Sequence, residues 1–480
     1  MSHQHSVFVK GSLIPIFSIC CTLLISSSPA LSADTPLPGD NPENATHHVV
    51  IISIDGFPAW YLWDERIPLP TIRKLANNGV YATAMIPSNP TLTWVNHTSM
   101  LTGAHPSEHG LLFNGKLIRG EPGDPLRVDN RRDRDEMIKL PTVYDIAFEA
   151  GLITADSGWP ATQNAGTLTY TLPGAVDNIA LMTPILRSDL AAKGLFDPDL
   201  DSFWGHQDYP QVRRDYIWKE TATHLVRQYQ PHLLLYHILN ADATQHLYGE
   251  GSVPGHLSLV LSDKYVKEVL LALEDAGILD RTTIFLVSDH GFMNIDYTLK
   301  PNVLLRKNGL LEIDEQGTIT RARVQVVPAG GAAAVFALEP DTRNHDIEEA
   351  KKIFTNASGI ARIITPDAYE RFGLPVPEDS DQVPDFYLEA EPHHSFSATA
   401  HGDTYYMEQD RRTGTHGFFH DRPEMETLFV ASGYGIRSGV RLETVDNRVV
   451  APTVACLLGL PMPTATVGAL LEVLTADSCP

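Results

Sequence analysis

The chain has 480 residues, of which 43% are hydrophobic and 20% are charged. This length exceeds that of one ordinary domain and allows a large buried core, and the apolar fraction excludes a disordered chain. The 36 Lys and Arg residues stand against 59 Asp and Glu residues, which gives a net charge of −23 at pH 7. Because such a chain repels polyanions, we expect no polymeric nucleic acid among its partners. Phosphate chemistry would need local positive charge, for example from metal ions.

The N-terminal segment has the pattern of a secretory signal. Residues 1–33 place a weakly basic start at Lys10 before an apolar stretch over residues 13–25, and small residues such as Ala33 offer a cleavage site. The stretch is too short and too interrupted to span a bilayer, so we favour a signal peptide over an uncleaved anchor or a disordered leader. Residues 34–46 are expected to form a linker, and no later stretch predicts a membrane span. The sequence thus predicts an exported protein, periplasmic or extracellular.

The cysteines allow one disulfide in the exported chain. Cys20 and Cys21 fall inside the predicted signal peptide, which leaves Cys456 and Cys479. These two could pair in an oxidising compartment. Cys456 also lies in the apolar run 454–460, however, where a buried free thiol is equally ordinary. The sequence leaves both alternatives open.

Three apolar runs indicate the centre of a parallel sheet. They cover residues 48–54, 232–239 and 282–288, and each reads as a strand buried on both faces. Between the last two, apolar residues recur at helical spacing over residues 264–277 and stop at a glycine. Strands that alternate with helices predict an α/β sandwich. In such a fold, ligands gather at the carboxyl ends of the strands.

A smaller unit interrupts this pattern. From residue 297 to 400 the sequence changes to strand-like pieces such as 332–338, one polar helix over 346–354, and Pro-rich links. We therefore predict a catalytic core over residues 47–296, an inserted α+β subdomain over 297–400, and a return to the core over 401–480.

Acidic and histidine side chains follow the predicted core strands. Three carboxylates and three imidazoles suit two divalent ions, zinc above all. Two of them are four residues apart, so one helical turn would aim both at one ion, and two others are adjacent at a strand end. Each residue alone is more often a turn or surface residue. Six such residues at strand ends, in one order, are much harder to explain by chance. The predicted ligands are Asp55, Asp242, His246, Asp289, His290 and His416.

A threonine-rich segment provides a candidate nucleophile. Residues 96–101 can begin a helix, which places Thr93 beside free amide N–H groups that suit an anion. A threonine hydroxyl is too weak an acid to attack phosphorus unaided, but coordination to a divalent ion makes it competent. The alternative is that Thr91 or Thr93 only caps the helix, and capping is compatible with attack.

These motifs together resemble the nucleotide pyrophosphatase/phosphodiesterase branch of the alkaline phosphatase superfamily. The similarity covers most of residues 48–295 and 401–465, in the order of the family. It implies an alkaline-phosphatase-like three-layer sandwich with a mostly parallel central sheet and an inserted smaller α+β subdomain. The motifs are Asp55-Gly56-Phe57, the Thr93 segment with Thr102-Gly103 and His109-Gly110, Asp242-x-x-x-His246, Ser288-Asp289-His290-Gly291 and Thr415-His416-Gly417-Phe418.

The resemblance also implies roles for individual residues. Thr93 would be the nucleophile, Asn114 would hold a phosphoryl oxygen, and Trp94 and Trp159 would flank the substrate pocket. Two zinc ions would be bound, the first by Asp55, Thr93, Asp289 and His290 and the second by Asp242, His246 and His416. The expected reaction has two in-line steps through a phospho-threonine, with net retention at phosphorus.

The expected substrate is a small phosphate diester, such as a nucleotide or a head-group ester. Enzymes that favour monoesters add an arginine for the extra phosphoryl oxygen, whereas Asn114 offers a neutral amide and only Lys116 lies nearby in sequence. A phosphomonoesterase or phosphonate hydrolase of the same superfamily is the alternative, and a non-catalytic binding protein is a remote one. A sulfatase is excluded because the Thr93 segment lacks a Cys/Ser-x-Pro-x-Arg run.

Overall fold

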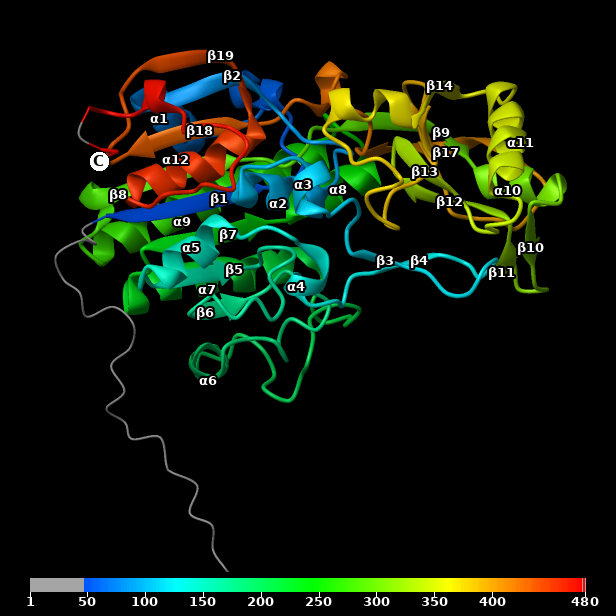
Figure 1. Cartoon of the computed structure of the whole chain (residues 1–480). Coiled ribbons are helices and arrows are strands. Elements are labelled where there is room, and N and C mark those ends of the chain that lie inside the picture. Colours follow the sequence, from blue (N-terminus) through cyan, green and yellow to red (C-terminus); the bar gives the residue numbers. More distant parts are fainter. Residues whose placement is uncertain (1–46, 477, 480) are drawn as a thin grey trace, which may run out of the picture.

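The computed structural model describes residues 47–476, 478 and 479. The predicted signal peptide (1–33) and linker (34–46), with Cys20 and Cys21, lie outside the described residues. Figure 1 shows a larger α/β body that contains both the first described strand and the C-terminal segment, and a smaller β-rich unit beside it.

The larger body is built on an eight-stranded sheet in the order β19-β2-β18-β8-β1-β7-β5-β6. The three predicted central strands are adjacent, because β1 pairs in parallel with both β7 and β8. Only β18 runs antiparallel to its neighbours. The strands are β1 (His48–Ile54), β2 (Val80–Ile86), β5 (Thr154–Ser157), β6 (Tyr170–Leu172), β7 (Leu233–Ile238), β8 (Thr282–Val287), β18 (Phe429–Gly433) and β19 (Val440–Asp446).

Helices cover both faces of this sheet. Successive side chains of β1 point to opposite faces, so Val50 and Ile52 enter one core and Val49 and Ile51 enter the other. The first core includes side chains of α1 (Pro70–Asn78), α6 (Pro184–Ala192), α7 (Gln211–Tyr229) and α9 (Val253–Asp275). The second includes side chains of α2 (Thr93–Thr102), α5 (Val143–Glu149) and α12 (Val450–Leu457). The three-layer sandwich is therefore confirmed, and its doubly covered strands explain the continuous apolar runs.

The smaller unit contains a third core under its own sheets. A four-stranded antiparallel sheet has the order β12-β13-β15-β14, and a three-stranded sheet has the order β16-β9-β17. Its strands are β9 (Met293–Leu299), β10 (Leu311–Ile313), β11 (Ile319–Ala322), β12 (Val324–Ala329), β13 (Ala332–Ala337), β14 (Ile360–Ile364), β15 (Phe386–Ala390), β16 (His394–Phe396) and β17 (Tyr406–Thr415). Its helices are α10 (Pro301–Lys307) and α11 (Arg343–Thr355).

The smaller unit extends beyond the predicted range of residues 297–400. The boundary at 297 cuts β9, and the boundary at 400 separates β17 from the sheet in which it pairs with β9. Most residues of β17 are exposed and polar, so its sequence lacks the apolar alternation by which a strand is recognised. This matters for the site, because β17 leads directly into His416.

A long hairpin also joins the two parts (Figure 1). Its strands β3 (Lys116–Ile118) and β4 (Arg127–Asp129) leave the larger body after α3 (Pro106–His109), and the chain returns to it at α4 (Arg134–Met137). The side chain of Gln382 bonds both the N–H and the carbonyl of Leu117, and Gln325 does the same for Leu126. These paired bonds fix the hairpin against the smaller unit.

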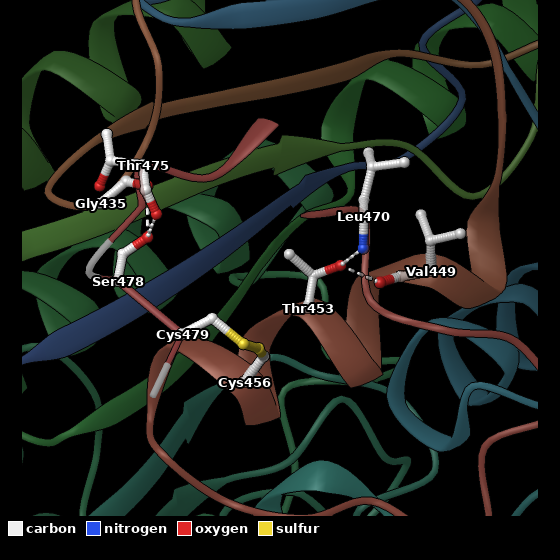
Figure 2. The surroundings of a disulfide bond; sticks show 8 residues. All are labelled: Gly435, Val449, Thr453, Cys456, Leu470, Thr475, Ser478 and Cys479. Atoms are coloured by element: carbon white, nitrogen blue, oxygen red, sulfur yellow. Dashed lines mark hydrogen bonds between the residues drawn. A yellow bond between two sulfur atoms is a disulfide. The ribbon is translucent and has the colours of Figure 1, made fainter. Parts of the chain in front are cut away.

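Cys456 and Cys479 form a disulfide, which settles the alternative that the sequence left open. Figure 2 shows the bond between the end of α12 and the C-terminal segment. Ser478, beside Cys479, donates a hydrogen bond to the Gly435 carbonyl, so the segment is fixed at two neighbouring points. Among residues 47–476, 478 and 479, no helix has the length and apolar character that crossing a bilayer requires.

Candidate active site

Three of the predicted metal ligands meet at the ends of the two central strands. Asp55 follows β1, and Asp289 and His290 follow β8, so the parallel pairing of β1 with β8 brings them together. The Nε2 atom of His290 lies 3.2 Å from Asp55 Oδ1 and 3.2 Å from Asp289 Oδ2. One donor atom from each residue lies within 4.8 Å of the others, and all three side chains are fully buried. We call these residues the first metal group.

The other three predicted ligands form the second metal group. Asp242 and His246 are one turn apart on α8 (Asn240–Tyr248), and His416 follows β17. Asp242 Oδ1 lies 3.2 Å from His246 Nε2 and 3.8 Å from His416 Nε2. Their donor atoms also lie within 4.8 Å of one another, but the His246 side chain is 38% exposed.

The two groups are in direct contact. The rings of His290 and His416 stack with centroids 3.5 Å apart, and the hydroxyl of Thr93 lies 3.4 Å from His290 Nε2. The structure therefore brings all seven predicted ligands to one edge of the sheet, although they are spread over more than three hundred residues of sequence.

The donor atoms fit metal ions. Asp55 Oδ1, Asp242 Oδ1 and Asp289 Oδ2 are buried without a hydrogen-bond partner in the described chain, which is a costly arrangement unless a ligand satisfies them. Each histidine of the two groups directs Nδ1 to a backbone carbonyl, and this fixes the tautomer that leaves the Nε2 lone pair for an ion. The carbonyls belong to Gly291 for His290, Gly414 for His246 and Thr91 for His416.

The electrostatics of the first metal group also favour a bound cation. Burial and the neighbouring Asp55 carboxylate raise the pKa of Asp289 to about 7. Burial opposes the charge on His290, but the two carboxylates outweigh it and raise the pKa of that imidazole to about 10. Without an ion, the protein thus holds two buried acids that resist simultaneous ionisation, and a divalent cation would relieve this conflict.

Thr93 is the first residue of α2. The next N–H, that of Trp94, donates to Asn114 Oδ1 at 3.0 Å, so the Asn114 amide nitrogen remains available as a donor, and Asn114 lines the same cavity as Thr93. His97, one turn along the helix, hydrogen-bonds the Thr93 carbonyl through Nδ1 at 2.8 Å. A helix N-terminus and an oriented amide therefore flank the Thr93 hydroxyl, as an anion-binding position requires.

A cavity of about 410 Å³ opens over these residues. Its walls include Thr93, Asn114 and the indole of Trp94, as the sequence predicted. Trp159 is different, because its side chain is fully buried and packs edge-on against His97, with ring centroids 4.8 Å apart, behind the cavity wall. The wall at this point is Pro160. The sequence placed the motif correctly, but it does not show which way each of its side chains points.

The cavity wall also contains side chains that the sequence did not single out, among them Trp204, Arg214, Trp218 and His237. His237 lies within β7 and directs Nε2 to Asp55 Oδ2 and Nδ1 to the Gly158 carbonyl, each at 3.0 Å. The Asp55 contact outweighs burial and raises the pKa of this imidazole. A histidine inside an apolar strand is the signal that could have identified it. The other three lie around residues 200–218, where no motif pointed to a site.

This geometry can be compared with known proteins. A family model described as type I phosphodiesterase/nucleotide pyrophosphatase matches residues 49–419. The chain belongs to this family. The human ectonucleotide pyrophosphatase/phosphodiesterase family member 1 is 24% identical over 429 residues, which cover 86% of this chain and 40% of that protein. An uncharacterized pyrophosphatase/phosphodiesterase of Schizosaccharomyces pombe is 23% identical over 457 residues, which cover 89% of this chain and 80% of that protein.

Solved structures of the family share the fold. Human ectonucleotide pyrophosphatase/phosphodiesterase 5 aligns with a TM-score of 0.64 and 16% identity over 89% of this chain and 100% of its own. The murine protein, as an inactive variant in complex with AMP, aligns with the same TM-score of 0.64. The α/β sandwich is therefore the fold of these solved family members. The chain spans less than half the length of the human family member 1.

Proposed function

We propose that this chain is an exported phosphodiesterase that hydrolyses phosphate diesters with two bound metal ions and a covalent phospho-Thr93 intermediate. The observation that carries the proposal is the position of the Thr93 hydroxyl. It lies at the start of a helix, 3.4 Å from His290 Nε2, where that ring stacks on His416 of the second metal group.

The proposed mechanism uses this arrangement in two steps. The ions, when bound, would supply the positive charge that acidifies the Thr93 hydroxyl and neutralises the phosphoryl oxygens. Thr93 Oγ1 forms a bond to phosphorus while the bond to the leaving alcohol breaks, and the hydroxyl proton passes to that alcohol. Water then adds to phosphorus, and Thr93 departs with a proton, which leaves a phosphate monoester. The Asn114 amide and the N-terminus of α2 hold a phosphoryl oxygen during both steps.

A diester is favoured over a monoester at the phosphoryl position. Asn114 is the side chain beside Thr93 there, and it carries no charge. Lys116, the one cation that the sequence placed nearby, instead lies 3.7 Å from Glu136 and is absent from the cavity wall. The murine relative that binds AMP is inactive with a threonine replaced by alanine, which supports a nucleotide-type ester and a threonine nucleophile here.

Zinc and export are supported by independent features. Three histidines and three aspartates form a donor set of the kind that zinc accepts. The disulfide between Cys456 and Cys479 is of the kind that persists in oxidising compartments, as expected outside the cytoplasm.

A substrate comparison tests the proposal. Wild-type protein loaded with zinc is assayed on bis-(p-nitrophenyl) phosphate, p-nitrophenyl phosphate and phosphonoacetate, with and without a chelator. We expect the highest kcat/KM on the diester and its loss on chelation. A preference for p-nitrophenyl phosphate would indicate a monoesterase, and a preference for phosphonoacetate would indicate a phosphonate hydrolase.

A further inference from the structure

An arginine is stacked on a tryptophan in the wall of the active-site cavity. The Cζ atom of Arg214, on α7, lies 3.9 Å from the ring centroid of Trp204, and both side chains line the same cavity as Thr93. Stacking on an indole fixes the plane of a guanidinium and leaves its N–H groups to donate outward at the edge. Arg214 is therefore held in place as a donor before any ligand arrives.

The guanidinium has unused donors. One Nη2 hydrogen goes to Gln211 Oε1, whereas Nε is buried and has no hydrogen-bond partner within the described chain. The adjacent carboxylate of Asp215 acts on the charge of Arg214 through space, but its oxygens accept from the N–H groups of Leu239 and Asn240 and not from the guanidinium. In the described part of the chain, Arg214 makes no ion pair. A half-buried guanidinium that has an unsatisfied donor and forms no ion pair is an arrangement that an anionic ligand completes.

The same contact argues against a cationic ligand. The tryptophans of the cavity could in principle form an aromatic cage for a quaternary ammonium head group. However, Arg214 already occupies a face of Trp204, so a second cation there would meet a like charge. The two metal groups, Thr93 and Asn114 already surround the proposed position of the transferred phosphoryl group. Among the described residues, Arg214 forms no hydrogen bond with any of them.

From these observations we infer that Arg214 on Trp204 forms a second anion-binding position, which selects phosphate diesters and anhydrides that carry another anionic group. This inference rests on the proposed diesterase function and narrows its substrate class. The second anion can lie on the leaving group, as in a nucleoside triphosphate, or on the retained nucleoside, as in a nucleoside bisphosphate. A diester with a choline head group is disfavoured.

Matched substrates test the inference. The singly charged reference is thymidine 5′-(p-nitrophenyl phosphate), and its 3′-phosphorylated form adds an anion on the retained side. ATP carries its additional anions on the leaving side, and p-nitrophenyl phosphorylcholine adds a cation. We expect Arg214→Gln to lower kcat/KM about 10- to 100-fold on one or both multiply charged substrates and less than about threefold on the reference, as loss of a charge-assisted hydrogen bond implies. Activity on the choline ester should not fall.

Two control variants guard against a structural effect. Arg213→Gln removes the neighbouring guanidinium, which is exposed and stacks on Tyr209 with Cζ 4.4 Å from the ring centroid, and should leave all ratios unchanged. Arg214→Lys keeps the charge without the planar fork and should recover part of the preference. Equal losses on all substrates, including p-nitrophenyl phosphate, would mean that Arg214 serves the transferred phosphoryl group, and would overturn the inference.

A binding measurement separates this inference from the proposed reaction. Calorimetry on zinc-loaded Thr93→Ala protein compares AMP with adenosine 3′,5′-bisphosphate and with ATP. We expect at least one of the two multiply charged ligands to bind about tenfold or more tightly than AMP, and this advantage to vanish when Arg214→Gln is added. If the wild-type chain cleaves none of the esters, the proposed reaction fails while the binding comparison still decides the anion position. Equal affinities with and without Arg214 would refute it.

Discussion

The two metal groups are chemically alike but are built in different ways. All three side chains of the first metal group are fully buried, and each follows a central strand of the eight-stranded sheet. The second group takes two ligands from α8 and the third from the end of β17, a strand of the smaller unit. Its His246 is 38% exposed. The first group is therefore fixed by the main core, whereas the second is complete only when the smaller unit is docked.

The contact that completes the second group is close. The N–H of Gly331 donates to the His416 carbonyl at 2.8 Å, and Gly330 adopts a left-handed backbone with φ +84° at the same turn. The turn between β12 and β13 thus fixes the backbone of a predicted metal ligand. We therefore expect metal binding at the second metal group to depend on the packing of the smaller unit, and the following changes test that dependence.

The largest expected effect concerns Thr93, which contacts His290 of the first metal group, and the His290 ring stacks on His416 of the second. Thr93→Ala should lower kcat on a diester by at least about 10³-fold because the attacking oxygen is lost. Metal content should fall less, since six of the seven ligands remain. Thr93→Ser is the matched control and should retain measurable activity. Full activity of the alanine variant in steady-state assays would remove the proposed mechanism.

The disulfide provides a stability change remote from both groups. Replacing Cys456 and Cys479 by serine opens a loop with a sequence separation of 23 residues. We expect the free energy of unfolding to fall by about 2–4 kcal/mol, because the unfolded chain gains freedom. Urea unfolding measures this change, and metal content and kcat should stay as in the wild type. A loss of either metal ion would show that the C-terminal segment also supports the site.

Gly330→Ala should weaken the second group selectively. A Cβ at Gly330 would lie 2.2 Å from the His416 carbonyl oxygen, so the turn must move and carry His416 with it. We expect affinity for the second ion to fall about 10- to 100-fold, as for other losses around metal ligands, while the first ion stays bound. Competition with a fluorescent zinc chelator measures both. Gly309→Ala is the control, because it has a similar φ of +73° and no atom within 4 Å of the added Cβ.

The first metal group should determine how the stability of the metal-free protein changes with pH. The pKa of Asp289 is raised to about 7, above that of an unfolded aspartate. The protonated acid therefore contributes stability below about pH 4, and this contribution is lost as the pH rises through about 7. We compare the free energy of unfolding at pH 5 and pH 8 with a chelator present. Between these pH values it should fall by about 1–2 kcal/mol less in Asp289→Asn than in the wild type.

The measurement is the slope of stability against pH, for the wild type and for Asp289→Asn. Chemical denaturation at several pH values gives these slopes. Identical slopes for the wild type and Asp289→Asn would contradict the buried charge conflict of the first group.

Much of the site could be predicted because the ends of buried strands can be recognised in the sequence. Asp55 and Asp289 follow long apolar runs, and strands buried on both faces belong to the centre of a parallel sheet, where ends converge. The i, i+4 spacing of Asp242 and His246 also defines their geometry as soon as a helix is assumed. The sequence therefore predicted the three-layer fold and the meeting of these ligands.

Other features depend on tertiary packing that local patterns do not encode. Trp159 belongs to a recognisable motif, but only packing against His97 shows that its ring points away from the cavity. Arg214 lies on an ordinary amphipathic helix, and its role arises from Trp204, ten residues earlier in a segment without periodicity. The polar strand β17 was missed as part of the smaller unit because it pairs at a sheet edge and carries no apolar stripe.

The central claim is that Thr93 attacks phosphorus and that water then releases it. The most direct test is the stereochemical course of hydrolysis of a phosphorothioate diester that is chiral at phosphorus, in isotopically labelled water. Two successive in-line displacements predict net retention of configuration. Net inversion would mean that water attacks the diester directly, and would contradict the account.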